Sequence, residues 1–140
     1  MTYEIDQEKL YARVEKEISR VAASSYSDDG GSLYDFIKVT SRDMDIIEEY
    51  CQGAVNAIFV AFAEYATKTA DAIELTFPDF DTTLETSVQE ELDRYVVYHT
   101  CSDWFRDKSV KDVAPYTERA ADALSKANML LKSRKPPKRT

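Results

Sequence analysis

The sequence predicts a mainly α-helical protein, with about four helices packed like a bundle around a long central helix and one or two short extended segments. Three observations predict this fold class. Glycine (3 residues) and proline (4 residues) are too scarce for the many tight turns of a β-sandwich or barrel. Apolar residues recur with helical spacing over long stretches. The 140 residues, 44% of them hydrophobic, suit one domain that buries a core without metal or disulfide crosslinks.

The first helix is expected over residues 6–23. Its apolar residues lie on one face, at Leu10, Val14, Ile18 and Val21. Asp6 is suited to cap its first turn. Ser, Asp and Gly residues then predict a turn at 24–31. Residues 33–39 are short and rich in aromatic and β-branched side chains, so both an extended segment and a single helical turn remain open.

The second helix is expected over residues 42–67, beginning after Thr40 and Ser41. Apolar residues surround most of its second half. A helix that is apolar on most sides is expected to lie centrally and to contact several neighbours.

Residues 72–77 alternate between apolar and polar side chains, which predicts a strand with Ile73, Leu75 and Phe77 on one face. A single strand is not stable alone. Its partner could be the segment 33–39 or a strand of a neighbouring subunit, because an open strand edge recruits pairing.

The third long helix is expected over residues 82–105. Thr82 and Glu85 are spaced as a capping box. The last helix begins near Ser109 or at Pro115, where proline is tolerated in a first turn, and it continues to residue 131.

The final nine residues form a basic segment, residues 132–140, after the domain of residues 1–131. It carries five positive charges and no negative ones, at Lys132, Arg134, Lys135, Lys138 and Arg139. The preceding residues hold 13 Lys and Arg against 26 Asp and Glu, a net charge of −13. The acidic body would repel phosphate, so nucleic acid is an unlikely partner except through this segment. We expect the segment to bind a partner.

The sequence predicts no catalytic, cofactor or metal site. His99 and Asp103 share a helix face, but zinc sites need further Cys and His ligands. His99 and Cys101 are too close in sequence to face each other on a helix. Cys51 and Cys101 are expected to be buried thiols in a reducing compartment. The acidic residues around Glu90 and Asp93 are expected on a solvated helix face.

The chain also shows neither a signal peptide nor an apolar run of membrane-spanning length. We therefore expect a protein that is made in the cytoplasm and has no membrane partner.

The order of these features resembles that of small phage and prophage structural proteins, in particular the mostly helical head–tail connector (head-completion or adaptor) proteins. The resemblance runs from about residue 33 onward. It rests on the helix start Thr40–Asp43, the segment Ile73–Pro78, the helix end Ser102–Phe105, and the stop at Arg134–Pro137. It implies a non-catalytic homo-oligomer that assembles as a ring between portal and tail, is found in the virion, and uses tails or strands to hold its neighbours.

A second hypothesis needs no resemblance. The chain would then be a small cytoplasmic helical regulatory or binding module that uses its basic segment to bind an acidic partner or nucleic acid. Binding through this segment would weaken steeply with salt.

Overall fold

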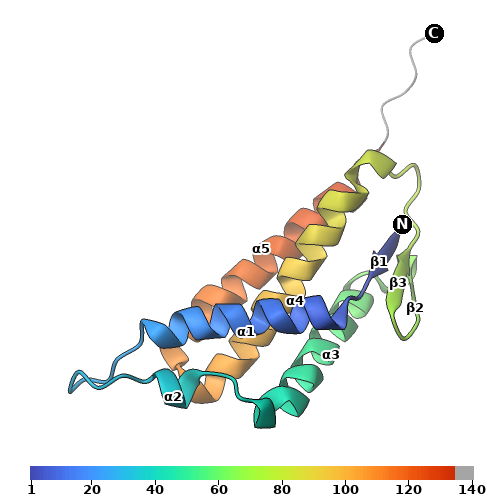
Figure 1. Ribbon diagram of the computed structural model, residues 1–140. Helices are drawn as coiled ribbons and strands as arrows, with labels where there is room; N and C mark the ends of the chain where they lie inside the picture. The colour runs from blue at the N-terminus through green and yellow to red at the C-terminus, as the bar shows by residue number, and fades with distance from the viewer. Residues whose placement is uncertain (135–140) are drawn as a thin grey trace.

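The computed structural model describes residues 1–134, and it confirms a mainly α-helical fold with a small sheet (Figure 1). The helices are α1 (Gln7–Ala23), the one-turn α2 (Tyr34–Ile37), α3 (Met44–Ala61), α4 (Glu85–Lys108) and α5 (Val113–Leu131). The strands are β1 (Thr2–Glu4), β2 (Ala66–Lys68) and β3 (Ala72–Leu75). None of the helices within residues 1–134 has the length and apolarity needed to cross a bilayer.

The central helix is α4, and not the helix expected over residues 42–67. Helix α4 packs along α5 and also contacts α1, α3 and β1. It buries residues on all sides, among them Val88, Leu92, Val96, Thr100 and Phe105. Helix α3 leaves Ile46 and Val60 exposed and lies to one side. A broad apolar surface on α3 was therefore misleading, because part of it faces solvent.

Helix α1 crosses α4 and forms the second layer of the molecule (Figure 1). The side chain of Asp6 accepts a hydrogen bond from the Lys9 backbone N–H at 3.2 Å, as its capping role predicts. The buried face contains Leu10, Val14, Ile18 and Ala22. The expected boundaries and inward face of this helix are confirmed.

The segment 33–39 forms the helical turn α2 and does not pair with β3. Its Ile37 side chain is buried, and the Ile37 carbonyl accepts a 2.7 Å hydrogen bond from Trp104 Nε1 on α4. This bond satisfies the indole N–H of a buried tryptophan and fixes α2 against the end of α4.

The expected end of the second helix at residue 67 is wrong, because α3 ends at Ala61. A short 3-10 helix (Ala63–Tyr65) follows, and residues 66–68 then form β2. The apolar residues beyond Ala61 continue the helical spacing, but they pack against β3 and Phe77. The helix does begin as expected, with Asp43 accepting a bond from the Thr40 N–H at 2.8 Å.

The sheet has the order β1-β3-β2, and both pairings are antiparallel. Tyr3 pairs with Ile73 on one side of β3, and Lys68 pairs with Ile73 on the other. Strand β1 was not predicted, because it is only three residues long.

The possible role of Ile73, Leu75 and Phe77 in pairing with another subunit is therefore corrected. Both edges of β3 are occupied within the same chain. Ile73 and Leu75 are buried in the core, and Phe77 lies beyond the end of the strand. Strand β3 has no unpaired backbone edge with which to bind a neighbour.

The last two long helices begin differently from the expected caps. Asp81, rather than Thr82, accepts a hydrogen bond from the Thr83 N–H at 3.0 Å, and a 3-10 turn (Thr82–Leu84) precedes α4. Helix α5 begins at Val113 after another 3-10 turn (Val110–Asp112), with Pro115 in its first turn. The two helices form an antiparallel hairpin, so α5 ends beside the start of α4 (Figure 1).

Candidate functional site

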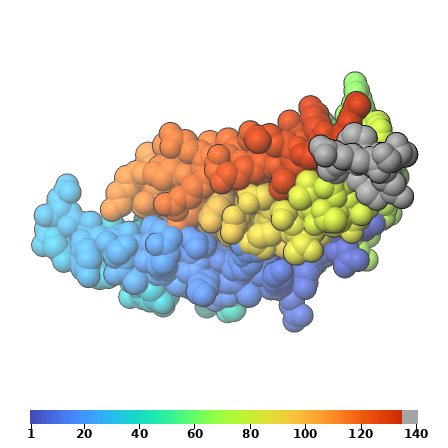
Figure 2. All heavy atoms as spheres, turned by 90° about the horizontal axis from the view of Figure 1, so that it is seen from above, coloured from blue at the N-terminus to red at the C-terminus, as the bar shows by residue number. Residues whose placement is uncertain are grey.

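The basic segment begins at the end of the molecule that also carries the sheet. Figure 2 shows this end, where the last turns of α5 meet the residues that follow α3, and the loop between α1 and α2 projects at the opposite end. Lys132 continues from α5 with its N–H bonded to the Asn128 carbonyl at 3.1 Å. The Ser133 carbonyl accepts a 3.2 Å bond from the Asp81 N–H, and Arg134 forms an antiparallel bridge with Phe80. The first residues of the basic segment are thus fixed against the domain.

An aromatic cluster lies next to this junction. The Phe77 and Tyr65 rings stack with centroids 4.4 Å apart, and Phe62 meets Phe77 edge-on at 5.9 Å. A hollow of about 320 Å³ is lined by these three rings, Val60, Asn128 and Lys132, among others. We call this hollow, with Met129 and residues 132–134, the C-terminal corner.

The C-terminal corner combines apolar and cationic groups at the surface. Val60 is 64% exposed and Met129 is 67% exposed. Lys132 and Arg134 are exposed and form no ion pair within residues 1–134. The structure therefore brings predicted residues from two groups together, since Phe77 and Lys132 line the same hollow. Lys135, Lys138 and Arg139 lie outside the described residues.

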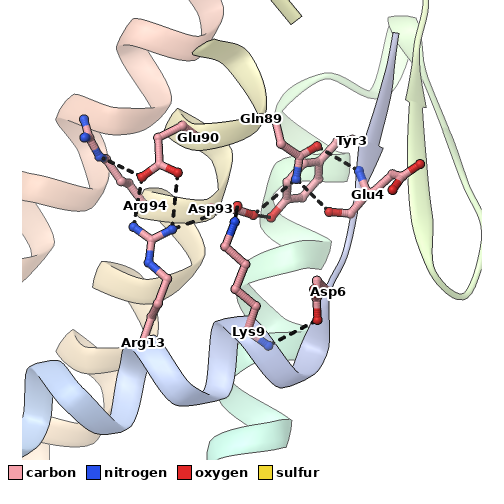
Figure 3. A network of polar contacts seen from close by, with 9 residues as sticks. All are labelled: Tyr3, Glu4, Asp6, Lys9, Arg13, Gln89, Glu90, Asp93 and Arg94. Carbon is pink, nitrogen blue, oxygen red and sulfur yellow. Dashed lines mark hydrogen bonds and ion pairs between the residues drawn. The ribbon is translucent and has the colours of Figure 1, made fainter. Parts of the chain in front are cut away.

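A second cluster of functional groups lies at the junction of β1, α1 and α4 (Figure 3). Its centre is Asp93, which is only 3% exposed although the sequence had placed it on a solvated face. The Tyr3 hydroxyl donates to Asp93 Oδ1 at 2.9 Å. Lys9 Nζ and Arg13 Nη1 lie 3.6 and 3.9 Å from Asp93 Oδ2.

Two further interactions extend this network. The Arg13 guanidinium donates a bidentate pair of hydrogen bonds to the Glu90 carboxylate, from Nη2 to Oε1 at 3.0 Å and from Nη1 to Oε2 at 3.4 Å. The Gln89 side chain accepts a 3.0 Å bond from the Glu4 N–H and donates a 2.8 Å bond to the Glu4 carbonyl. The Gln89 side-chain amide therefore pairs with the backbone N–H and carbonyl of Glu4 at the outer edge of β1, as a neighbouring strand would. Because β1 was not expected, the sequence offered no partner for Asp93 and no reason to bury it.

Asp93 is surrounded by donors and cations that occupy its oxygens, so the network is built to anchor the N-terminus to α4. Burial raises the pKa of the Asp93 carboxyl, and the Tyr3 hydrogen bond with the Lys9 and Arg13 charges offsets this rise only in part. Burial beside Asp93 also raises the pKa of the Tyr3 hydroxyl far above its usual range. The fold therefore favours the neutral phenol of Tyr3 and makes Asp93 easier to protonate than an exposed aspartate.

Because the pKa of Asp93 is raised, we predict that the contribution of its protonation to the free energy of unfolding declines as the pH rises. The folded state holds this proton more tightly than the unfolded chain, in which an aspartate has a pKa of about 3.9. The contribution is therefore complete below that unfolded value and is lost as pH rises through the folded pKa. We expect the free energy of unfolding of the wild type, minus that of Asp93→Asn, to fall as the pH rises from the unfolded pKa through the folded pKa of Asp93.

Urea denaturation of both proteins at a series of pH values measures this difference. Subtraction is needed because Glu17 titrates in the opposite sense. Burial alone would raise the Glu17 pKa, but hydrogen bonds from Arg20 and Tyr116 outweigh burial and lower it. A difference between the two proteins that stays constant or grows with pH would contradict the assignment.

The remaining residues that the sequence singled out do not form a site together. His99 Nδ1 lies 3.4 Å from Asp103 Oδ2 on the same helix. Cys101 is fully buried, and its pKa is raised chiefly by burial. Cys51 is also a free buried thiol, with a pKa raised to about 11 by burial. Within residues 1–134, no group of three or more His, Cys, Asp and Glu side chains is placed to hold a metal ion.

No protein-family model matches the chain, and neither a curated protein nor a solved structure matches it. The chemistry of the C-terminal corner and of the Asp93 network must therefore indicate the function. The centre of the network, Asp93, is buried and its oxygens are occupied by partners, whereas the corner is exposed and has unused apolar and cationic groups. The corner is the better candidate for a site that binds another molecule.

Proposed function

We propose that this chain is a non-catalytic assembly subunit that binds protein partners through its C-terminal corner, as a head–tail connector subunit of a phage or prophage would. The observation that supports this proposal most directly is the joining of an exposed apolar hollow to the basic segment. Exposed apolar side chains that gather around a hollow are typical of protein–protein contacts. Aromatic side chains such as Tyr65 and Phe77 are enriched in such contacts.

The charge distribution favours a second copy of the chain as the first partner. Residues 1–131 carry a net charge of −13, and the basic segment carries +5. Opposite charges on two parts of one chain attract different copies to each other in a head-to-tail manner. Such contacts close into a ring when the rotation between neighbouring subunits allows it.

We expect the full chain to form oligomers that Val60→Gln and Met129→Gln weaken. Each change replaces an exposed apolar side chain of the corner with a polar one that suits a helix, so the domain should stay folded. Size-exclusion chromatography with light scattering over a range of protein concentrations measures the assembly. The oligomer should also dissociate further at high salt, because the basic segment contributes by charge.

Val110→Gln is the matched control. Val110 is 76% exposed, but it lies in the turn between α4 and α5, at the opposite end of the hairpin. This variant should assemble like the wild type. A strict monomer at every concentration, or equal loss of assembly in Val110→Gln, would refute self-assembly through the corner.

The connector role makes a further demand on partners. The protein should be made in the cytoplasm, should join portal or tail proteins, and should be present in purified virions. Genes for portal, capsid and tail proteins beside this gene would favour the role. A protein that never joins portal, tail or virion particles would count against it.

The alternative is a small regulatory or binding module that acts through the basic segment alone. The exposed Lys132 and Arg134 at the start of this segment favour it. Deletion of residues 135–140 would then abolish binding to an acidic protein or nucleic acid, while Val60→Gln and Met129→Gln would leave it unchanged. The two sets of variants thus separate the two functions.

A further inference from the structure

A second hollow lies away from the C-terminal corner, between the first turns of α1, the middle of α3 and the hairpin that joins β2 to β3. It has a volume of about 380 Å³, within the range typical of small-molecule sites. Its apolar wall includes Leu10, Cys51 and Val55, all buried. Its polar lining includes Gln52, Lys68 and Asp71, all exposed. We call it the hairpin cleft.

The wall of the hairpin cleft is uncharged. Burial raises the Cys51 pKa to about 11, so this side chain is a neutral thiol, and its sulfur already accepts a 3.4 Å hydrogen bond from Thr100. Tyr11, which also lines the cleft, has its pKa raised to about 12 by burial and is a neutral phenol. An apolar group of a ligand would therefore replace water against a neutral wall, which is favourable.

The rim carries two opposite charges that the fold does not use. Lys68 Nζ forms no ion pair or hydrogen bond with any of residues 1–134, and the same holds for the Asp71 carboxylate. The two residues flank the tip of one hairpin, at the end of β2 and just before β3. Elsewhere in the molecule, paired charges such as Arg13 with Glu90 serve to join elements. Lys68 and Asp71 join nothing and face the same hollow.

The geometry points to a binding site for an apolar α-amino acid in the hairpin cleft. The carboxylate of such a zwitterion would pair with Lys68, its ammonium group with Asp71, and its side chain would lie against Leu10 and Val55. One small ligand would then use both unpaired charges and the neutral wall. This inference does not depend on the assembly role, because none of the residues that line the cleft belongs to the C-terminal corner.

The test uses three related compounds with the full chain: L-phenylalanine, 3-phenylpropionate, which lacks the amine, and phenethylamine, which lacks the carboxylate. Titration followed by amide NMR shifts gives both the affinity and the location of each compound. We expect L-phenylalanine to bind saturably with shifts at α1, α3 and the hairpin. Each of the other two should bind about tenfold more weakly, as the loss of one charged contact implies.

Two substitutions test which charged group of the ligand each rim residue contacts. Lys68→Gln should lower the affinity for L-phenylalanine to that of phenethylamine, and Asp71→Asn should lower it to that of 3-phenylpropionate. Both side chains are exposed, so neither change should affect folding. Gln52→Trp should block the cleft, whereas Asn56→Trp, one turn later on the exposed face of α3, should not.

Several results would overturn the inference. They are the absence of saturable binding to L-phenylalanine, shifts located outside the cleft, equal binding of all three compounds, and wild-type affinity in Lys68→Gln and Asp71→Asn. Failure of the assembly role would appear in the chromatography of the corner variants and would leave these titrations unchanged.

Discussion

Ile58→Asp is expected to unfold the domain at neutral pH. Ile58 is 0% exposed and lies on the face of α3 that contributes to the hydrophobic core. The change removes a buried apolar side chain, which costs about 2–5 kcal/mol. It also places a carboxylate where no cation is paired with it, at a further cost of several kcal/mol. Because a domain of this size is stable by about 5–15 kcal/mol, the sum approaches or exceeds the whole stability.

Circular dichroism during heating measures this effect, and Asn56→Asp is the control. Asn56 lies two residues earlier on the exposed side of the same helix, so the control introduces the same charge without burying it. It should change the free energy of unfolding by less than about 0.5 kcal/mol. A cooperative melt of Ile58→Asp at the wild-type temperature would show that the orientation of α3 is wrong.

Asp93→Ala should lower the free energy of unfolding by about 2–4 kcal/mol. The Asp93 carboxylate accepts hydrogen bonds from the Tyr3 hydroxyl and the Gln89 amide, and it forms ion pairs with Lys9 and Arg13. Its removal leaves the buried Tyr3 hydroxyl without an acceptor and removes the charge that Arg13 faces inside the network. Urea denaturation at neutral pH gives the value.

Two further variants show whether the loss comes from this network. Asp93→Asn should cost less than Asp93→Ala, because the amide oxygen can still accept from Tyr3. Tyr3→Phe should cost about 1–2 kcal/mol, and adding Asp93→Ala to it should cost less than the sum of the two single changes. Strict additivity would mean that Tyr3 and Asp93 do not interact.

The helices were largely predictable, because α1, α3 and α5 each have one inward stripe of apolar residues that the sequence displays directly. Leu10, Val14 and Ile18 on α1 are examples, and Asp6 caps this helix as its residue type suggests. The end of α3 was not predictable, because Phe62 and Tyr65 keep the helical spacing while they serve a strand and an aromatic cluster. The spacing of apolar residues shows which side chains can be buried together, but it does not show which element they pack against.

The candidate sites were predictable to very different degrees. Lys132 and Arg134 were identified by charge alone; the structure shows Lys132 lining the apolar hollow and Arg134 forming a bridge with Phe80. Asp93 was missed because its partners are more than eighty residues away in sequence. Tyr3 lies on a strand too short to give a pattern, and the pattern of α1 does not show that Lys9 faces α4. The hairpin cleft was missed for a related reason, since it draws its lining from three separate segments.

The sheet also imposes an order of events during synthesis. Strand β1 leaves the ribosome about seventy positions before its partner residues 72–74. At about 5–20 residues per second, the first strand waits roughly 4 to 14 s for its partner. Asp93 and Gln89, which fix Tyr3 and Glu4 from the other side, arrive later still. Strand β1 therefore stays unpaired for longer than β2, whose partner residues 73–75 follow it within a few positions.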